Sequence, residues 1–340
     1  MDARVVPVGG LTAGQVEAAL RAATAAPSLH NSQPWRFRCT SSAIELYADP
    51  ARAVAVADPD HRELLLACGA ALLNLRLAIR AMGVYPDVRG FPDPARPHLL
   101  AMVRPAGRRA ATPADRALAA AVARRRTNRR PFVPAPVPAA VRNRLRRAAE
   151  AERSWLAILD RTQMAVLRAL VDQAHRAQLA DAQFVAEWRH WTGRADDTWD
   201  GVPARSAGPA PEPQDEWVLR DFTAGRAARR VAGKDFEPEP LIVVVGSFQD
   251  GRASQLQVGQ AMQRVLLTAT EEGLAASFLS QVVEVPQARR ELRALIGGGL
   301  WPQTVLRIGY GSPVPATPRR PLEDVLMTAD LRPVATGRVE

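Results

Sequence analysis

Residues 69–83, GAALLNLRLAIRAMG, form the core of a long apolar segment. Apolar residues occur on all sides of the helix that this segment predicts over residues 62–82, which indicates a central, buried helix. Gly83 follows its last turn as a C-terminal cap. A second segment, residues 259–273 (GQAMQRVLLTATEEG), has the same separation between its bounding glycines and predicts a helix over residues 254–272. The two helices suggest that the chain contains two similar halves.

A second parallel lies upstream of each long helix. LRAATAAPSLHNSQPWRF begins at Leu20, and LRRAAEAERSWLAIL begins at Leu145. Both contain a helix pattern followed by Trp, but only the first contains the Pro-Ser-x-x-Asn segment. The simplest account is a duplicated α+β unit, with halves at residues 1–110 and 111–340. Chance similarity between amphipathic helices is the alternative.

The remaining pattern predicts an α+β fold, with an antiparallel-rich sheet and long central helices packed as an internal pseudo-dimer. Thr12 caps the first helix, residues 12–25, with Gln15 three residues later. Gly, Pro and Asp residues predict a long loop over residues 192–214. Expected strands are 35–39, 43–47, 99–103, 155–159, 241–247, 277–281 and 305–309, and expected helices are 114–125, 139–151, 163–191 and 286–296.

Composition bounds the class of protein. The chain has 340 residues, 47% apolar and 24% charged, enough to bury a core in one large or two ordinary domains. Its net charge is +10, but the cations are scattered Arg residues, Lys234 is the only lysine, and aromatic residues are few. A nucleic-acid partner is therefore not expected. A small ligand that carries a phosphate remains compatible, because Arg matches phosphate geometry.

Cysteine and hydropathy patterns indicate the compartment. Cys39 and Cys68 lie among apolar residues and are expected to be buried free thiols, with a disulfide or redox pair as the alternative. No charged-then-apolar signal opens the chain, and no apolar run is expected to reach membrane-spanning length. We therefore expect a soluble, cytoplasmic protein without a membrane partner.

The segment APSLHNSQPW, residues 26–35, has the composition of a tight polar bend. Pro27 ends the preceding helix, and Ser28 and Asn31 bring short polar side chains to the bend. Such a bend could present hydrogen-bond donors to a flat ligand, or it could be a turn that satisfies only its own backbone. His30 has no partner acid or second metal ligand at a diagnostic spacing.

The segment RRRTNRRPF, residues 124–132, concentrates five Arg around Thr127 and Asn128. Arg binds phosphate in a bidentate way, and Thr or Asn adds hydrogen bonds, so the segment could hold an anion. It could also be a solvated basic end of a helix, where Arg is favoured by the helix dipole. The sequence leaves both interpretations open.

These segments resemble the flavin-dependent nitroreductase family, in its two-copy, Acg-type branch. The bend and the Arg segment are both similar to motifs of that family. EEGLAASFLSQ, residues 271–281, resembles the segment beside the flavin ring, and VLRIGYGSPVPATPRRP, residues 305–321, resembles the C-terminal strand and basic tail. Together they cover most of the chain.

The resemblance implies one FMN site shared by the two halves, because each half has only one of the two motifs. Arg125, Thr127 and Arg129 would hold the phosphate and ribityl groups; Arg126, Asn128 and Arg130 are the alternative register. Pro27, Ser28 and Asn31 would border the ring from the other half. Leu279, Ser280 and Gln281 would lie near its reactive edge, and Arg319 and Arg320 would reach the phosphate. No catalytic side chain and no metal are implied.

The resemblance also implies NADH or NADPH as electron donor and a nitroaromatic or quinone acceptor. The alternative is a flavin-binding or sequestering protein with little turnover, since an insertion at residues 192–233 could cover the pocket as a lid. Because the halves would satisfy each other's interface, a monomer is expected. Its partners would be the flavin and a small electron acceptor.

Overall fold

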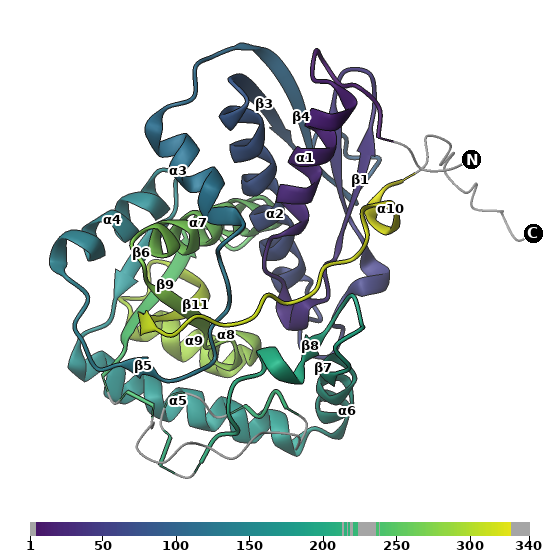
Figure 1. Ribbon diagram of the computed structural model, residues 1–340. Helices are drawn as coiled ribbons and strands as arrows, with labels where there is room; N and C mark the ends of the chain where they lie inside the picture. The colour runs from purple at the N-terminus through teal and green to yellow at the C-terminus, as the bar shows by residue number, and fades with distance from the viewer. Residues whose placement is uncertain are drawn as a thin grey trace, which may run out of the picture.

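The computed structural model describes residues 5–212, 214–215, 217, 220–223, 236–237 and 239–327. Two antiparallel sheets, one of four strands and one of five, are joined by long helices, which confirms the predicted α+β class (Figure 1). The first sheet has the order β1-β2-β4-β3, and the second has the order β6-β9-β11-β10, with β5 paired to β11. The strands are β1 (Trp35–Cys39), β2 (Ile44–Ala48), β3 (Val84–Gly90), β4 (Leu99–Arg108), β5 (Phe132–Val133), β6 (Trp155–Ile158), β9 (Leu241–Ser247), β10 (Ala275–Phe278) and β11 (Trp301–Gly311).

The helices follow the sequence pattern closely. The expected helix over residues 163–191 is two helices, because Asp181 caps the second. The helices are α1 (Ala13–Thr24), α2 (Arg62–Ala81), α3 (Pro113–Val122), α4 (Ala139–Glu150), α5 (Arg161–Ala180), α6 (Ala182–Trp191), α7 (Arg252–Glu271), α8 (Gln281–Glu284), α9 (Pro286–Leu295) and α10 (Leu322–Val325), with short 3₁₀ helices at Leu29–Asn31, Pro50–Arg52 and Ala204–Ser206.

Capping residues fix the helix ends. Thr12 and Gln15 form the expected capping box of α1, with Thr12 accepting from the Gln15 amide at 3.3 Å. The predicted C-terminal glycines of α2 and α7 are both left-handed, Gly83 at φ +76° and Gly273 at φ +72°. This conformation suits glycine because it has no Cβ.

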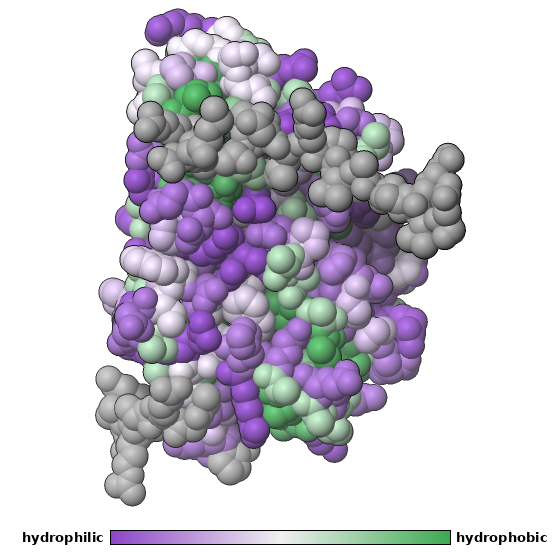
Figure 2. Space-filling model, turned by 90° about the vertical axis from the view of Figure 1, so that its right-hand side faces the viewer, coloured by the Kyte–Doolittle hydropathy of each residue, from purple (hydrophilic) through white to green (hydrophobic). Residues whose placement is uncertain are grey.

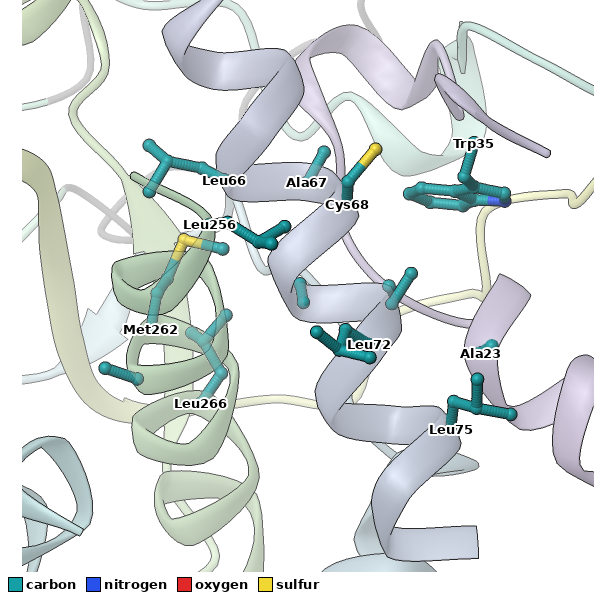
Figure 3. Packing of buried hydrophobic residues seen from close by; sticks show 14 of the residues in the cluster. Ala23, Trp35, Leu66, Ala67, Cys68, Leu72, Leu75, Leu256, Met262 and Leu266 are labelled. Atoms are coloured by element: carbon teal, nitrogen blue, oxygen red, sulfur yellow. The ribbon is translucent and has the colours of Figure 1, made fainter. Parts of the chain in front are cut away.

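Helices α2 and α7 cross at two glycines in the centre of the core. A Cβ on Gly69 would lie 2.2 Å from the Leu256 carbonyl oxygen, and one on Gly259 would lie 2.2 Å from the Leu66 carbonyl oxygen. Only hydrogen side chains permit this approach of the two backbones. Leu66, Leu256 and other buried apolar residues fill the adjoining space between the helices (Figure 3).

The second sheet is buried on both faces. Val243 and Val245 of β9 face the core that α4 and α7 cover, whereas Ile242 and Val244 face the core that α5, α8 and α9 cover. This alternation follows from the period of two along a strand. Each fully buried apolar side chain contributes about 1.5–3 kcal/mol of hydrophobic stabilisation.

Helix α2, the two cysteines and the loop after α6 each add a detail that the sequence did not predict. Helix α2 is long and apolar enough by composition to span a membrane, contrary to the expectation, but 78% of its most apolar window is buried inside the protein. Cys39 and Cys68 are free thiols, and Cys39 is only partly buried. β7 (Thr192–Arg194) and β8 (Val202–Pro203) form a short parallel pair within the expected loop.

The C-terminal segment joins the two sheets. After β11, it crosses the molecule to α10 beside β1 (Figure 1), where the Met327 amide donates to the Phe37 carbonyl at 2.7 Å. Figure 2 shows the face toward the termini, on which hydrophilic side chains predominate. The segment that carries Arg319 is thereby held against the first half of the chain.

Candidate functional site

The bend at residues 26–35 has an unusual backbone. His30, Asn31 and Gln33 all have positive φ, at 49°, 58° and 55°. Left-handed residues other than glycine each cost free energy and are held only where surrounding contacts determine them. Ser28 supplies one such contact, because its Oγ accepts from the Gln33 amide at 2.9 Å. The bend is therefore partly a turn that satisfies its own backbone.

The same bend is also anchored to distant segments. Asn31 Nδ2 donates to the carbonyls of Gly201 at 3.0 Å and Pro318 at 3.1 Å. Gln33 Nε2 donates to the Trp199 carbonyl at 2.8 Å. These contacts bring together the first half, the segment after β7 and the C-terminal tail.

The Arg segment lies against the opposite side of the site. Thr127 forms a parallel bridge with Ala276 of β10, and the Asn128 amide donates to the Ala276 carbonyl at 2.8 Å. Arg129 donates to the Ser206 carbonyl at 3.0 Å, and its guanidinium lies 4.4 Å from the centre of the Phe222 ring. Strand β10 therefore positions this segment beside residues 277–281.

Arg125 is the most deeply buried cation of the segment, with 4% of its surface exposed. Its Nη2 donates to the Ala25 carbonyl at 3.4 Å, whereas its buried Nε and Nη1 have no hydrogen-bond partner among the described residues. Buried guanidinium donors without partners are costly and suit an anion. The side chain reaches from the second half to the end of α1 in the first.

Three guanidiniums share this environment without a paired carboxylate among the described residues. Burial lowers the pKa of Arg125 to about 9, with Arg319 and Arg126 lowering it further. Burial also lowers the pKa of Arg129 to about 10 and that of Arg319 to about 10, the latter with a contribution from Arg126. An anion bound beside Arg125 would relieve its repulsion with Arg319 and Arg126.

Arg319 links the cluster to the bend. Its Nη1 donates to Asn31 Oδ1 at 3.0 Å, and its Nε donates to the Thr24 carbonyl at 2.9 Å. Arg320 lies differently: its amide donates to Gln33 Oε1 at 2.9 Å, and its guanidinium is 3.8 Å from Asp49. The two tail arginines thus face different neighbours.

A pocket is lined by residues from both 27–67 and 127–281. Seven of the residues singled out from the sequence line it: Pro27, Ser28, Thr127, Arg129, Leu279, Ser280 and Gln281. Arg125, Asn31 and Arg319 lie in the adjoining polar cluster, and Arg320 lies outside it. The other lining residues are Leu29, His30, Glu63, Leu66, Ala67, Trp217, Arg220, Phe222, Met262, Ser277 and Phe278.

The side chains of Trp217, Arg220 and Phe222 cover one side of this pocket. Arg220 is held there because it pairs with buried Glu284 of α8 and donates to Gln178 of α5 at 2.6 Å. The cavity has a volume of about 80 Å³, below the roughly 300–1,000 Å³ of typical ligand pockets. A large flat ligand would need this cover to move.

Sequence reasoning missed Glu63 and gave no role to His30. Glu63 lies in the first turn of a helix whose pattern indicated only a core element, and its one signal was a charge in that apolar segment. His30 is buried, and its Nε2 has no hydrogen-bond partner in the part of the chain that the structure describes. Burial lowers the pKa of His30 to about 3, with Arg220 and Arg129 lowering it further and Glu284 opposing them.

The buried His30 predicts acid sensitivity. The folded-state pKa of His30 lies below its unfolded value of 6.5, because the folded protein accommodates the neutral ring and disfavours the charged one. The stability that neutral His30 contributes is therefore complete above pH 6.5 and is lost as the pH falls from 6.5 toward 3. Between pH 6.5 and 5 this loss is about 2 kcal/mol. In His30→Asn, which keeps a residue tolerant of positive φ, urea unfolding should show a correspondingly smaller loss of stability. Equal losses in both proteins would contradict this reading.

Gln257 of α7 occupies the helix position that matches Ala67 of α2. Helices α2 and α7 have bounds offset by 190 residues at both ends, which aligns Ala67 of the pocket with Gln257. Gln257 Nε2 donates to the carbonyls of Glu152 at 2.9 Å and Arg153 at 3.2 Å. Gln257 is thus bonded to the connection between α4 and β6, whereas Ala67 lines the pocket beside the bend.

The chain is similar to curated proteins over most of its length. No family model matches the chain. It is 35% identical over 318 residues to "Putative NAD(P)H nitroreductase Rv3131" of Mycobacterium tuberculosis, covering 92% of this chain and 90% of that protein. It is 34% identical over 324 residues to "Putative NAD(P)H nitroreductase acg" of the same organism, covering 93% and 96%. A nitroreductase with bound FMN from Bacteroides fragilis matches at 14% identity and a TM-score of 0.35, covering 66% of this chain and 98% of that one.

Proposed function

Because the chain belongs to the family of NAD(P)H nitroreductases that includes Acg of Mycobacterium tuberculosis, we propose that it binds one FMN in the pocket between its halves. We further propose that it reduces nitroaromatic or quinone-type acceptors with NADH or NADPH, in the cytoplasm. The observation that carries this proposal is that Arg125, Arg129 and Arg319 form no ion pair with a carboxylate in the described part of the chain, beside a pocket lined by residues from both halves.

The residues present fit the polar part of FMN. Unpartnered donors of Arg125 and the nearby Arg319 would hold the phosphate, and Thr127 and Arg129 would contact the ribityl chain. The register Arg125-Thr127-Arg129 is favoured, because Thr127 and Arg129 line the pocket whereas Arg126, Asn128 and Arg130 do not. Arg320 could join the phosphate only by leaving Asp49.

The apolar and bent parts of the site suit the ring. Pro27 and Ser28, which line the pocket, would border it from the first half together with Asn31 of the adjoining cluster, and residues 279–281 would lie near its reactive edge. When bound, FMN supplies hydride transfer between the nicotinamide and the acceptor. The protein's own contribution is to bind and orient both ligands and to exclude water.

We also propose that the chain is a fused duplication, with halves at residues 1–110 and 111–340. Three observations support it: the shared strand order, the constant 190-residue offset of α2 and α7, and the reciprocal approach of Gly69 and Gly259. Because this crossing already joins the halves, we expect a monomer.

A second function, flavin sequestration with little turnover, is favoured by the cover over the pocket. Trp217, Arg220 and Phe222 belong to the proposed lid at residues 192–233, of which 213, 216, 218–219 and 224–233 lie outside the described residues. With this cover in place, flavin could remain bound while NAD(P)H is excluded.

One preparation separates the two functions. The purified protein is loaded with FMN, its visible spectrum is recorded, and NADPH and then NADH are added without oxygen. Bleaching of the flavin band supports the reductase, and a stable yellow protein supports sequestration. A protein that takes up no FMN contradicts both.

The two halves should contribute separately to FMN binding. We expect Asn31→Ala and Arg129→Ala each to weaken FMN binding about 10-fold or more, since each removes about 1.5 kcal/mol or more of polar contact. Fluorescence titration of FMN measures this. Asn31→Gly, which tolerates φ +58°, separates loss of the amide from backbone strain. Wild-type affinity in all three variants would contradict the composite site.

A further inference from the structure

Glu63 is an acidic side chain in the pocket that neither the motifs nor the proposed flavin contacts explain. It lies in the first turn of α2, and it lines the cavity together with Leu66 and Ala67 of the same helix. Asp58 fixes the helix start, because its two carboxylate oxygens accept from the amides of Glu63 and Leu64, both at 2.9 Å. The carboxyl group is therefore held at the wall of the site.

The surroundings of Glu63 favour its protonated form. Burial is the largest effect and raises its pKa to about 7, with Asp58 and Glu284 raising it further and Arg62 opposing them. Arg62 Nη2 donates to Glu63 Oε1 at 2.6 Å, but Arg62 also donates to the Gln303 and Val283 carbonyls. Within the described part of the chain, no hydrogen bond reaches Oε2. Both protonation states are accessible near neutral pH.

A second cavity is lined by Arg62, the residue before Glu63 in the chain. It has a volume of about 280 Å³ and is lined by Asp58, Asp60, Arg62, Glu284 and Trp301, among others. Asp60 is exposed, so the cavity has contact with solvent at that end. Arg62 and Glu284 line this cavity, whereas Glu63, next to Arg62 in the chain, lines the first. Carboxyl groups and space for water thus lie beside Arg62, the hydrogen-bond partner of Glu63.

We propose that Glu63 donates the proton that accompanies reduction of the acceptor, and that it regains a proton from the second cavity. This inference rests on the proposed function. Two-electron reduction of a quinone consumes one hydride equivalent, which NAD(P)H supplies, and one proton. The O–H bond of Glu63 breaks, an O–H bond forms on the acceptor oxygen, and the resulting carboxylate takes a proton from water on the side of Asp58 and Glu284.

The variant Glu63→Gln keeps the shape of the protonated acid and cannot donate a proton. With FMN-loaded protein and a quinone acceptor, wild-type kcat should fall as pH rises above about 7, where Glu63 ionises. We expect Glu63→Gln to lower kcat about 100-fold and to remove this pH dependence, while Glu63→Asp restores part of the rate. Glu17→Gln, on the exposed face of α1, is the matched control and should behave as wild type.

A second readout needs no flavin. A raised folded-state pKa stabilises the protein below the unfolded pKa, and this contribution is lost as pH rises through about 7. The Tm of apo Glu63→Gln should therefore exceed that of wild type at pH 8 and match it near pH 4.5. An infrared band of a protonated carboxyl at pH 6 should be absent from the variant.

The outcomes distinguish the two proposals. If wild type binds no FMN, the proposed function fails, and the role of Glu63 fails with it. If wild type binds FMN and turns over, but Glu63→Gln keeps its rate and pH profile, only the role of Glu63 is overturned. The role of Glu63 would also be overturned if Glu63→Gln had the same Tm as wild type at pH 8 and the same infrared carboxyl band at pH 6. Glu63 would then not carry the proton.

Discussion

Gly69→Ala is expected to destabilise the protein by about 3 kcal/mol, the upper range for overpacking a core. The added Cβ would lie 2.2 Å from the Leu256 carbonyl oxygen and 2.9 Å from the Gly259 Cα, both of which are backbone atoms. Neither can move without separating α2 from α7, the two helices on which both sheets pack. Urea unfolding followed by circular dichroism measures the loss.

Gly14→Ala is the matched control for this substitution. Gly14 also lies in a helix, α1, but nothing is within 4 Å of a Cβ built there. Alanine should be neutral or stabilise this helix by about 0.5–1 kcal/mol. If Gly69→Ala were as stable as Gly14→Ala, the close crossing of α2 and α7 would be wrong.

Arg125→Met is expected to weaken FMN binding about 100-fold, equivalent to about 3 kcal/mol. Two donors of this guanidinium are buried without partners, so the proposed phosphate would gain charge-assisted hydrogen bonds there. The same change should not destabilise the apo protein, because it removes a buried, unpaired charge. Affinity is measured by FMN fluorescence quenching and stability by urea unfolding.

Arg124→Met removes the same charge one residue earlier, from an exposed position. It should leave FMN affinity within about twofold of wild type, since exposed charges are screened by solvent. Equal losses in the two variants would indicate a general effect of net charge, and equal retention would remove Arg125 from the site. A strongly destabilised Arg125→Met would assign Arg125 a structural role instead.

Local patterns explain how much of the fold could be predicted. The expected bounds of α2, residues 62–82, differ from the observed Arg62–Ala81 by one residue, because Gly83 is a strong local stop. Strand β3 was missed because its sequence, VYPDVRG, contains Pro86 and exposes most of its residues. The pairing of β3 with β4 depends on neighbours that are distant in sequence.

The candidate site could likewise be predicted from the sequence only in part. The bend and the Arg segment were recognisable because each is a run of unusual composition, and their absence from opposite halves suggested that they belong together. Glu63 and Phe222 are ordinary residues in sequence, and their place in the pocket follows from tertiary contacts alone. Arg320, in a run that resembles the family tail, lies toward Asp49 instead.

The stoichiometry of FMN binding tests the central proposal most directly. Fluorescence titration of the purified protein, with its concentration determined by amino-acid analysis, gives the number of FMN molecules per chain. The composite pocket predicts one, because the position equivalent to Ala67 in the second half is Gln257, whose side chain is bonded to residues 152–153. Two FMN molecules per chain, or none, would contradict a single site built from both halves.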